Sequence, residues 1–261
     1  MDAFVAIGIF IPFVGTSLGA LMALGMKNQM KPLTRKILYG FASGIMISAA
    51  FFSLLGPAVE YLEETGRNPW FAPSLGFALG IAFLLILDTV IPHLHKTSDT
   101  PEGMRTGKLK KSTMLAFAIT LHNIPEGMAV GVVFAGALTG NEIMTLSGGM
   151  ILAVVIALHN FPEGAVVSMS LRDSGVSKRK SVLIGMGSGV VEPIAALITL
   201  VITSLIHPIL PYVLAFAAGA MIYVVIEELV PDAMEGEHSN IAVIGAAIGF
   251  ILLMAMELGL H

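Results

Sequence analysis

The chain has 261 residues, of which 56% are hydrophobic and 12% are charged, and its mean hydropathy is +0.87. A soluble domain typically carries about a quarter charged residues, so this composition excludes an ordinary soluble enzyme and a disordered chain. The net charge of −4 provides no basic field for nucleic acid, and the absence of cysteine excludes disulfides and thiolate metal sites. The remaining class is a polytopic membrane protein.

The hydrophobic segments are long enough to cross a membrane eight times. A hydrocarbon core of about 30 Å requires about 20 residues of apolar helix. We therefore predict an all-α protein in which one transmembrane domain covers residues 1–261, with 92–111 as its longest polar loop. The predicted spans are about 4–26, 36–59, 71–91, 112–138, 145–171, 181–206, 209–230 and 241–260. Seven Gly-x-x-x-Gly pairs in or at the ends of these spans predict close helix packing.

The basic residues predict the orientation of the spans. Thirteen of the 14 Lys and Arg residues fall in or beside the loops after spans one, three and five, and only Arg67 falls on the other side. The positive-inside rule places those three loops, including 92–111, in the cytoplasm. Both termini are then expected on the extracytoplasmic side of a cell membrane.

A polar hexapeptide occurs twice inside the predicted spans. His122-Asn-Ile-Pro-Glu126-Gly lies in span four, and His159-Asn-Phe-Pro-Glu163-Gly lies in span five, which runs in the opposite direction. The helical rise places both copies near the membrane midplane, at the same depth as Glu192 in span six. Ionisable side chains at this depth are costly and usually mark function.

The spacing within each copy suits a metal ion. His and Glu at positions i and i+4 project from one helix face, so His122, Glu126, His159 and Glu163 offer two imidazoles and two carboxylates to a divalent transition metal. Asn123 and Asn160, turned by about 100°, are candidates for a second site with Glu192, bridged by the two motif glutamates. The competing interpretation is a hydrogen-bonded polar cluster that fixes helix register. Two inverted copies and a third carboxylate at one depth favour the metal.

These motifs resemble those of the ZIP (Zrt/Irt-like) family of divalent metal transporters, and most closely its prokaryotic GufA-like branch. The resemblance covers essentially the whole chain, and includes Ser53-Leu-Leu-Gly-Pro-Ala58, Asp88-x-x-x-Pro-His93 and Glu227-Glu228-Leu-Val-Pro231. It implies a binuclear metal centre, formed by His122, Glu126, His159 and Glu163 on one side and by Asn123, Asn160 and Glu192 on the other. It also implies a homodimer.

The resemblance further implies a mechanism. The expected fold is a 3+2+3 arrangement in which spans one to three are related to spans six to eight by an inverted repeat. Spans one, four, five and six are expected to slide as an elevator against the other four. The expected substrate is Zn²⁺, with Cd²⁺, Fe²⁺, Mn²⁺ or Co²⁺ as alternatives, moved toward the cytoplasm.

Polar residues at the predicted cytoplasmic ends of spans three and seven have two interpretations. They are either an exit path that receives the released metal or solvated helix ends. The residues concerned are Asp88, His93, His95, Glu227 and Glu228.

Two other functional classes compete with transport of a metal. An intramembrane metal-dependent hydrolase would need an open water position and a separate general base, but the inverted symmetry favours a path over a one-sided pocket. A proton- or sodium-coupled antiporter could use the three glutamates, but the pair of imidazoles favours a transition metal. We therefore expect a transporter, with no enzymatic activity and no nucleic-acid partner.

Overall fold

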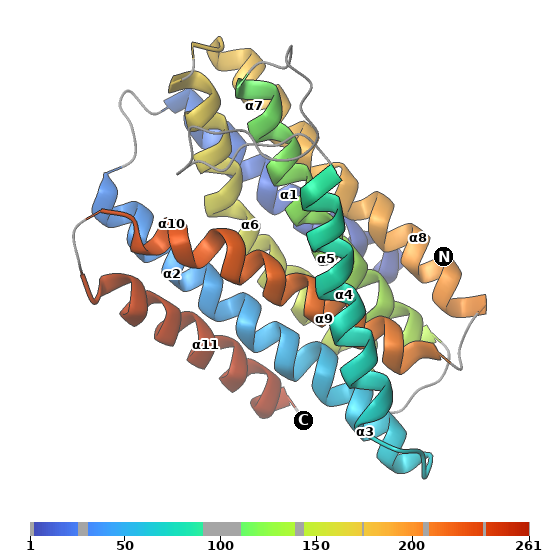
Figure 1. Ribbon diagram of the computed structural model, residues 1–261. Helices are drawn as coiled ribbons and strands as arrows, with labels where there is room; N and C mark the ends of the chain where they lie inside the picture. The colour runs from blue at the N-terminus through green and yellow to red at the C-terminus, as the bar shows by residue number, and fades with distance from the viewer. Residues whose placement is uncertain are drawn as a thin grey trace.

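The computed structural model describes residues 3–25, 31–90, 111–138, 144–173, 175–205, 209–236 and 239–260. Within these ranges all regular secondary structure is helical, which confirms the all-α prediction (Figure 1). Five of the predicted spans are single uninterrupted α-helices. They are α1 (Ala3–Gly25), α4 (Phe71–Val90), α5 (Lys111–Leu138), α6 (Leu146–Asp173) and α11 (Ile241–Leu260).

The other three spans are each built from consecutive helical pieces. Span two comprises α2 (Pro32–Ser48), the π-helix η1 (Ala49–Leu55) and α3 (Gly56–Glu64), and span seven comprises α9 (Leu210–Val224), the π-helix η3 (Val225–Leu229) and α10 (Val230–Met234). Pro57 and Pro231 stand in the first turn of the piece that follows each π-helix. A proline has no N–H to donate to the preceding turn, and the wider π-turn accommodates that break.

Span six is divided just before its buried glutamate. It comprises α7 (Lys178–Gly189) and α8 (Val191–Leu205), with a turn at Val190. Pro193 cannot donate to the carbonyl of Gly189, the residue at which α7 ends. The local sequence thus explains the interruption beside Glu192.

The helices agree with the predicted spans. Seven helical stretches of the described residues are long and apolar enough to cross a membrane. The eighth, α5, is 28 residues long and contains the shorter apolar segment Asn123–Leu138. Helix continues beyond the apolar part in span two, which was predicted at 36–59 and extends over Pro32–Glu64, because hydropathy marks the membrane-crossing part and not the end of the helix.

Glycines bring four pairs of helices into backbone contact. The pairs are α1 with α6, α2 with α11, α4 with α9, and α5 with α8. A Cβ atom on Gly44 would lie 1.9 Å from the carbonyl oxygen of Ala246, and one on Gly80 would lie 2.0 Å from that of Phe216. Both glycines meet a partner backbone in five predicted Gly-x-x-x-Gly pairs, which confirms their packing role: Gly15/Gly19, Gly40/Gly44, Gly76/Gly80, Gly127/Gly131 and Gly245/Gly249.

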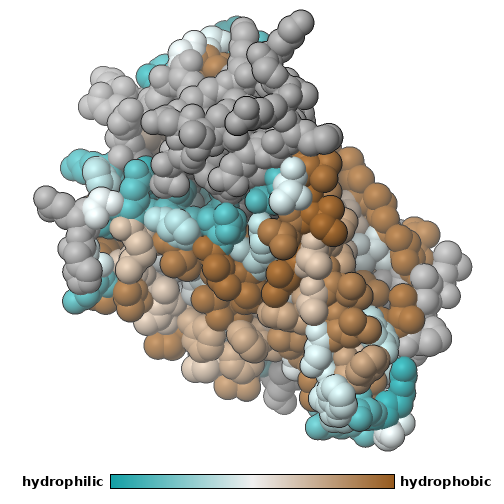
Figure 2. Space-filling view, in the orientation of Figure 1, coloured by the Kyte–Doolittle hydropathy of each residue, from teal (hydrophilic) through white to brown (hydrophobic). Residues whose placement is uncertain are grey.

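A broad apolar zone covers described residues on the face of the molecule seen in Figure 2. In Figure 2 hydrophobic residues lie between a hydrophilic zone, where α2 begins and α10 ends, and a hydrophilic patch at the turn between α3 and α4. Large side chains on α4 and α11 face outward, among them Ile86 at 60% exposure and Ile248 at 56%. An apolar belt between two polar zones is the surface expected of a multi-pass membrane protein.

Candidate metal centre

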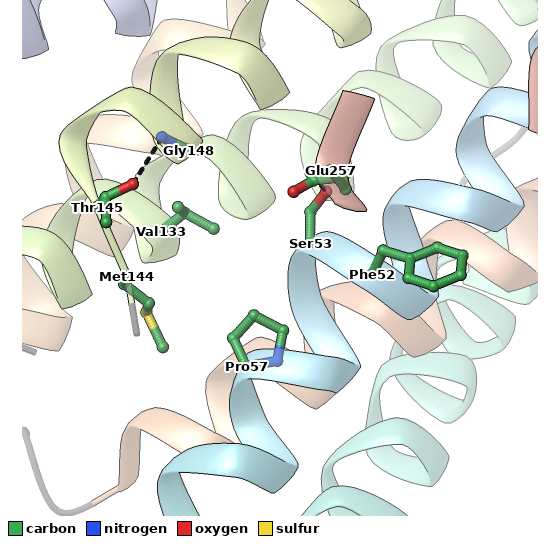
Figure 3. Close-up of a pocket in the computed structure, with 8 residues that line it drawn as sticks. All are labelled: Phe52, Ser53, Pro57, Val133, Met144, Thr145, Gly148 and Glu257. Atoms are coloured by element: carbon green, nitrogen blue, oxygen red, sulfur yellow. Dashed lines mark hydrogen bonds between the residues drawn. The ribbon is translucent and has the colours of Figure 1, made fainter. Parts of the chain in front are cut away.

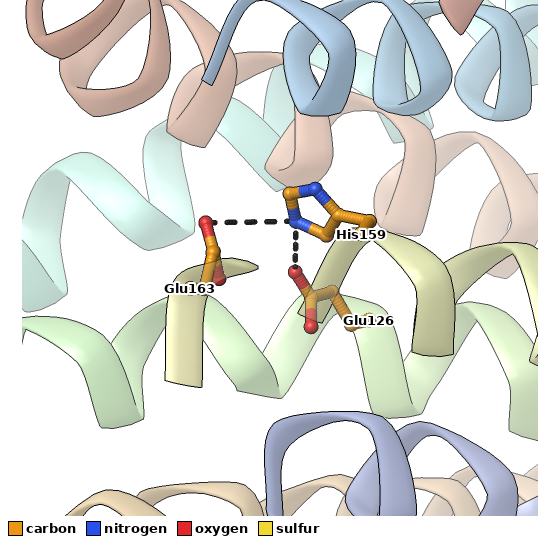
Figure 4. A group of neighbouring side chains, drawn as sticks. All are labelled: Glu126, His159 and Glu163. Carbon is orange, nitrogen blue, oxygen red and sulfur yellow. Dashed lines mark hydrogen bonds and ion pairs between the residues drawn. The ribbon is translucent and has the colours of Figure 1, made fainter. Parts of the chain in front are cut away.

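Helices α5 and α6 bring two carboxylates and one imidazole together in the interior. Glu126 comes from α5, and His159 and Glu163 come from successive turns of α6, so both face the same side (Figure 4). The Nε2 atom of His159 lies 3.0 Å from Oε1 of Glu126 and 3.6 Å from Oε1 of Glu163. Glu126 and His159 are fully buried, and Glu163 is 9% exposed. The two copies of the hexapeptide therefore meet across the interface of these helices.

The spacing of these atoms suits a small cation. Four ligands placed tetrahedrally around Zn²⁺ at about 2.0–2.1 Å are about 3.4 Å apart, and the two distances from His159 lie on either side of that value. One ligand atom from each of the three side chains lies within 4.8 Å of the others. No other group of three His, Asp or Glu side chains meets this criterion among the described residues.

The same cluster contains polar atoms without protein partners. Within the described part of the chain, Oε2 of Glu126 and Nδ1 of His159 have no hydrogen-bond partner. Burying an ionised carboxylate is costly unless an opposite charge or hydrogen bonds compensate it. A bound divalent cation would supply that compensation.

The two other residues of the first hexapeptide differ in what the structure describes. The side chain of His122 lies outside the described part, although its backbone belongs to α5. Asn123 is buried, and its Nδ2 donates a hydrogen bond of 3.1 Å to the carbonyl of Ser188 at the end of α7. That bond leaves Oδ1 as the atom of Asn123 that can bind a cation.

Glu192 on α8 is a further buried carboxylate. It is fully buried, its Oε1 accepts a hydrogen bond of 2.6 Å from Oγ1 of Thr16 on α1, and its Oε2 has no partner among the described residues. The carboxylate of Glu192 lies close enough to those of Glu126 and Glu163 for electrostatic repulsion between them. Asn160, the other amide of the expected second site, is also buried. Sequence reasoning missed Thr16, because a single threonine in an apolar span carries no signal of its own.

The glycine that ends each hexapeptide makes room for a neighbouring backbone. A Cβ on Gly127 would lie 2.2 Å from the carbonyl oxygen of Glu192, and one on Gly164 would lie 2.1 Å from that of Thr16. Substituting either glycine would therefore require the neighbouring helix to move. These two residues set how closely α8 and α1 approach the centre.

The residues of the expected exit path are described only in part. Asp88 on α4 accepts a hydrogen bond of 3.0 Å from the hydroxyl of Tyr223 on α9. Tyr223 precedes Glu227 by one helical turn. Glu227 and Glu228 belong to the π-helix η3. His93 and His95 lie outside the described residues. The exit path stays a prediction.

A pocket near the end of α11 contains a carboxylate that sequence reasoning did not single out. Glu257 is buried and accepts a hydrogen bond from Ser53 of η1 (Figure 3). A glutamate close to the end of the last apolar span was the available signal. Eight residues line the pocket: Phe52, Ser53, Pro57, Val133, Met144, Thr145, Gly148 and Glu257.

Comparison with known proteins identifies the family of this chain. Residues 103–257, which include both hexapeptides and Glu192, match the family model described as ZIP Zinc transporter. The zinc transporter ZIP11 of Homo sapiens is 31% identical over 97% of this chain and 96% of its own length. The chain belongs to the ZIP zinc transporter family. Two bacterial ZIP relatives are similar: zinc transporter ZIPB of Bordetella bronchiseptica at 35% identity, covering 95% of this chain and 78% of its own, and zinc transporter GufA of Myxococcus xanthus at 34%, covering 94% of each.

Membership in the ZIP family confirms the resemblance seen in the motifs, including that to the GufA-like branch. It identifies the chain as a transporter of divalent metal and not as an enzyme. Together with the apolar helices, it also identifies the chain as a multi-pass membrane protein.

Proposed function

We propose that the protein carries Zn²⁺ across the cell membrane into the cytoplasm through the centre formed by α5, α6 and α8. The observation that carries the proposal is the buried cluster of Glu126, His159 and Glu163, with partner-free atoms and ligand spacing suited to a small divalent ion. The names of the similar proteins favour Zn²⁺ over Cd²⁺, Fe²⁺, Mn²⁺ and Co²⁺. The cation is the cargo, so the residues must both bind it and release it.

The centre holds two metal ions in this proposal. Glu126, His159 and Glu163 bind the first, with His122 as the fourth ligand. Asn123, Asn160 and Glu192 bind the second, and Glu126 and Glu163 bridge the two ions. Support comes from the burial of Asn123, Asn160 and Glu192 and from the electrostatic interaction of Glu192 with both bridging glutamates.

The helix pairs support an inverted repeat. Exchanging spans one with six, two with seven, three with eight and four with five turns the α1–α6 pair into the α8–α5 pair. The same exchange turns the α2–α11 pair into the α9–α4 pair. The π-helices η1 and η3 also fall in spans that the exchange relates.

The same pairs support an elevator motion. The α1–α6 and α5–α8 pairs contain spans one, four, five and six, which contribute all the proposed ligands. The α2–α11 and α4–α9 pairs contain spans two, three, seven and eight. Each group can then move as a unit. We propose that the ligand-bearing group slides against the other one and carries the metal from the outer side to the cytoplasmic side. The basic loops after spans one, three and five support this orientation.

Uptake of Zn²⁺ into proteoliposomes tests the proposal. Purified wild type, His159→Ala and Glu163→Gln are compared with Glu63→Gln, which changes an exposed carboxylate of α3 as a matched control. Wild type and Glu63→Gln are expected to take up Zn²⁺ at similar rates. His159→Ala and Glu163→Gln are expected to lose at least about ten-fold, because even residues that only support metal ligands contribute 10–100-fold to affinity. Unchanged uptake in both variants would contradict the proposed centre.

A further inference from the structure

In the proposed inverted repeat, which relates span one to span six, Thr16 of the first half of the chain corresponds to Glu192 of the second. The two residues are 176 positions apart. With that offset, 14–20 (Val-Gly-Thr-Ser-Leu-Gly-Ala) aligns with 190–196 (Val-Val-Glu-Pro-Ile-Ala-Ala), and both segments begin with Val and end with Ala. The proposed exchange of span one with span six pairs the same two segments.

The packing around the two residues agrees with that alignment. The backbone of Glu192 lies against Gly127 of the first hexapeptide, and the backbone of Thr16 lies against Gly164 of the second. Each residue therefore lies where its own helix, α8 or α1, contacts a helix that carries a hexapeptide. The hydroxyl of Thr16 lies where a symmetric centre would place a further carboxylate.

The hydroxyl is directed at the carboxylate of Glu192. Thr16 is only 2% exposed, and its Oγ1 lies 2.6 Å from Oε1 of Glu192 but 3.4 Å from the carbonyl of Pro12 in its own helix. The Cβ and methyl groups of Thr16 pack beside Gly189, where a side chain would come within 3.0 Å of them. The rotamer of Thr16 is thus confined, and one oxygen of Glu192 is held while Oε2 has no partner in the described residues.

We propose that Thr16 is a positioning residue of the metal centre. Its hydroxyl donates to one oxygen of Glu192 and orients the other oxygen toward the transported cation. A hydroxyl at this position supplies the hydrogen bond without the negative charge of a further carboxylate, so the centre keeps three glutamates and not four. This inference rests on the proposed function, because it concerns how the cation is held.

Two substitutions separate the hydroxyl from the packing of its methyl group. Thr16→Val keeps the shape and removes the donor, while Thr16→Ser keeps the donor and removes the methyl group. Affinity for Zn²⁺ is measured on detergent-solubilised protein by competition with a chromogenic chelator, and KM and maximal rate are measured in proteoliposomes. Hydrogen bonds to charged groups have effects that correspond to about ten-fold or more in affinity. Thr16→Val is therefore expected to bind about ten-fold more weakly and to raise KM, and Thr16→Ser is expected to restore both.

Two further variants complete the test. Thr199→Val removes the hydroxyl of another buried threonine of α8, about 10 Å along the helix from Glu192, and is expected to bind as wild type does. In a Glu192→Ala background, Thr16→Val is expected to cause no additional loss of affinity, because no carboxylate remains to be oriented. A further ten-fold loss in that background would overturn the inference.

Other results would also overturn the inference. Wild-type affinity of Thr16→Val would do so, as would a defect in Thr16→Ser equal to that of Thr16→Val, which would assign the role to packing. Failure of the proposed transport gives a different result. Wild type would then take up no Zn²⁺ into proteoliposomes, while the binding comparison in detergent would still decide the role of Thr16.

Discussion

Gly164→Ala tests whether the approach of α1 to the second hexapeptide holds the centre together. The added Cβ would lie 2.1 Å from the carbonyl oxygen of Thr16 and 3.1 Å from the amide nitrogen of Ala20, and side-chain Cβ atoms essentially never come closer than 3.0 Å to another heavy atom. Helix α1 would have to retreat by about 0.9 Å. A hydrogen bond of 2.6 Å from Thr16 to Glu192 that lengthens by this amount reaches about 3.5 Å, the limit of a useful bond.

The expected result of Gly164→Ala is a loss of both stability and affinity. Overpacking of this kind typically costs about 1–3 kcal/mol, and the weakened bond adds a drop in Zn²⁺ affinity. Gly187→Ala is the matched control, since a Cβ at that exposed position of α7 meets no atom within 4 Å. Thermal unfolding in detergent and Zn²⁺ uptake in proteoliposomes are measured for both variants. If Gly164→Ala matches Gly187→Ala in both assays, the packing argument is refuted.

Three further substitutions are expected to change stability by different amounts, each read from thermal or denaturant unfolding in detergent. Phe134→Ala is expected to cost about 3–5 kcal/mol, because this fully buried ring fills the space beside Gly8 and Gly149, and a loss below 1 kcal/mol would contradict its role. Ser53→Ala is expected to cost about 1–3 kcal/mol, since it removes the donor to the buried carboxylate of Glu257, and Ser53→Thr is expected to retain most of that stability. Arg35→Gln is expected to cost less than about 1 kcal/mol and to matter less at high salt, because its ion pair with Glu235 is partly exposed; a large, salt-independent loss would count against this.

Hydropathy predicted the apolar helices, because a bilayer imposes one requirement on every crossing of the chain. Each crossing needs about 20 apolar residues whose backbone groups are satisfied within the helix. The prediction of α5 illustrates how well this works: residues 112–138 were expected, and the helix extends over Lys111–Leu138. The interruptions within spans two and seven were not predicted, since π-turns depend on local backbone geometry that hydropathy does not encode.

The candidate centre was predictable only for residues that carry charge or repeat in a motif. Glu126, His159 and Glu163 were singled out together, and the structure brings them within ligand distance of one another. Thr16 was missed, because a hydroxyl in an apolar span is common and gains meaning only from the carboxylate it faces. That partner lies on a helix more than 170 residues away in the chain, which no local pattern reveals.

The pairing of the helices sets the order in which the protein can assemble during synthesis. Helix α1 packs on α6, and α2 packs on α11. These two contacts can form only after the later helix of each pair has been inserted into the bilayer. The backbone surfaces at Gly40 and Gly44 are completed only by residues Ala242 and Ala246, close to the end of the chain. A nascent chain halted before residue 241 would lack α11 and would leave that surface of α2 open to lipid.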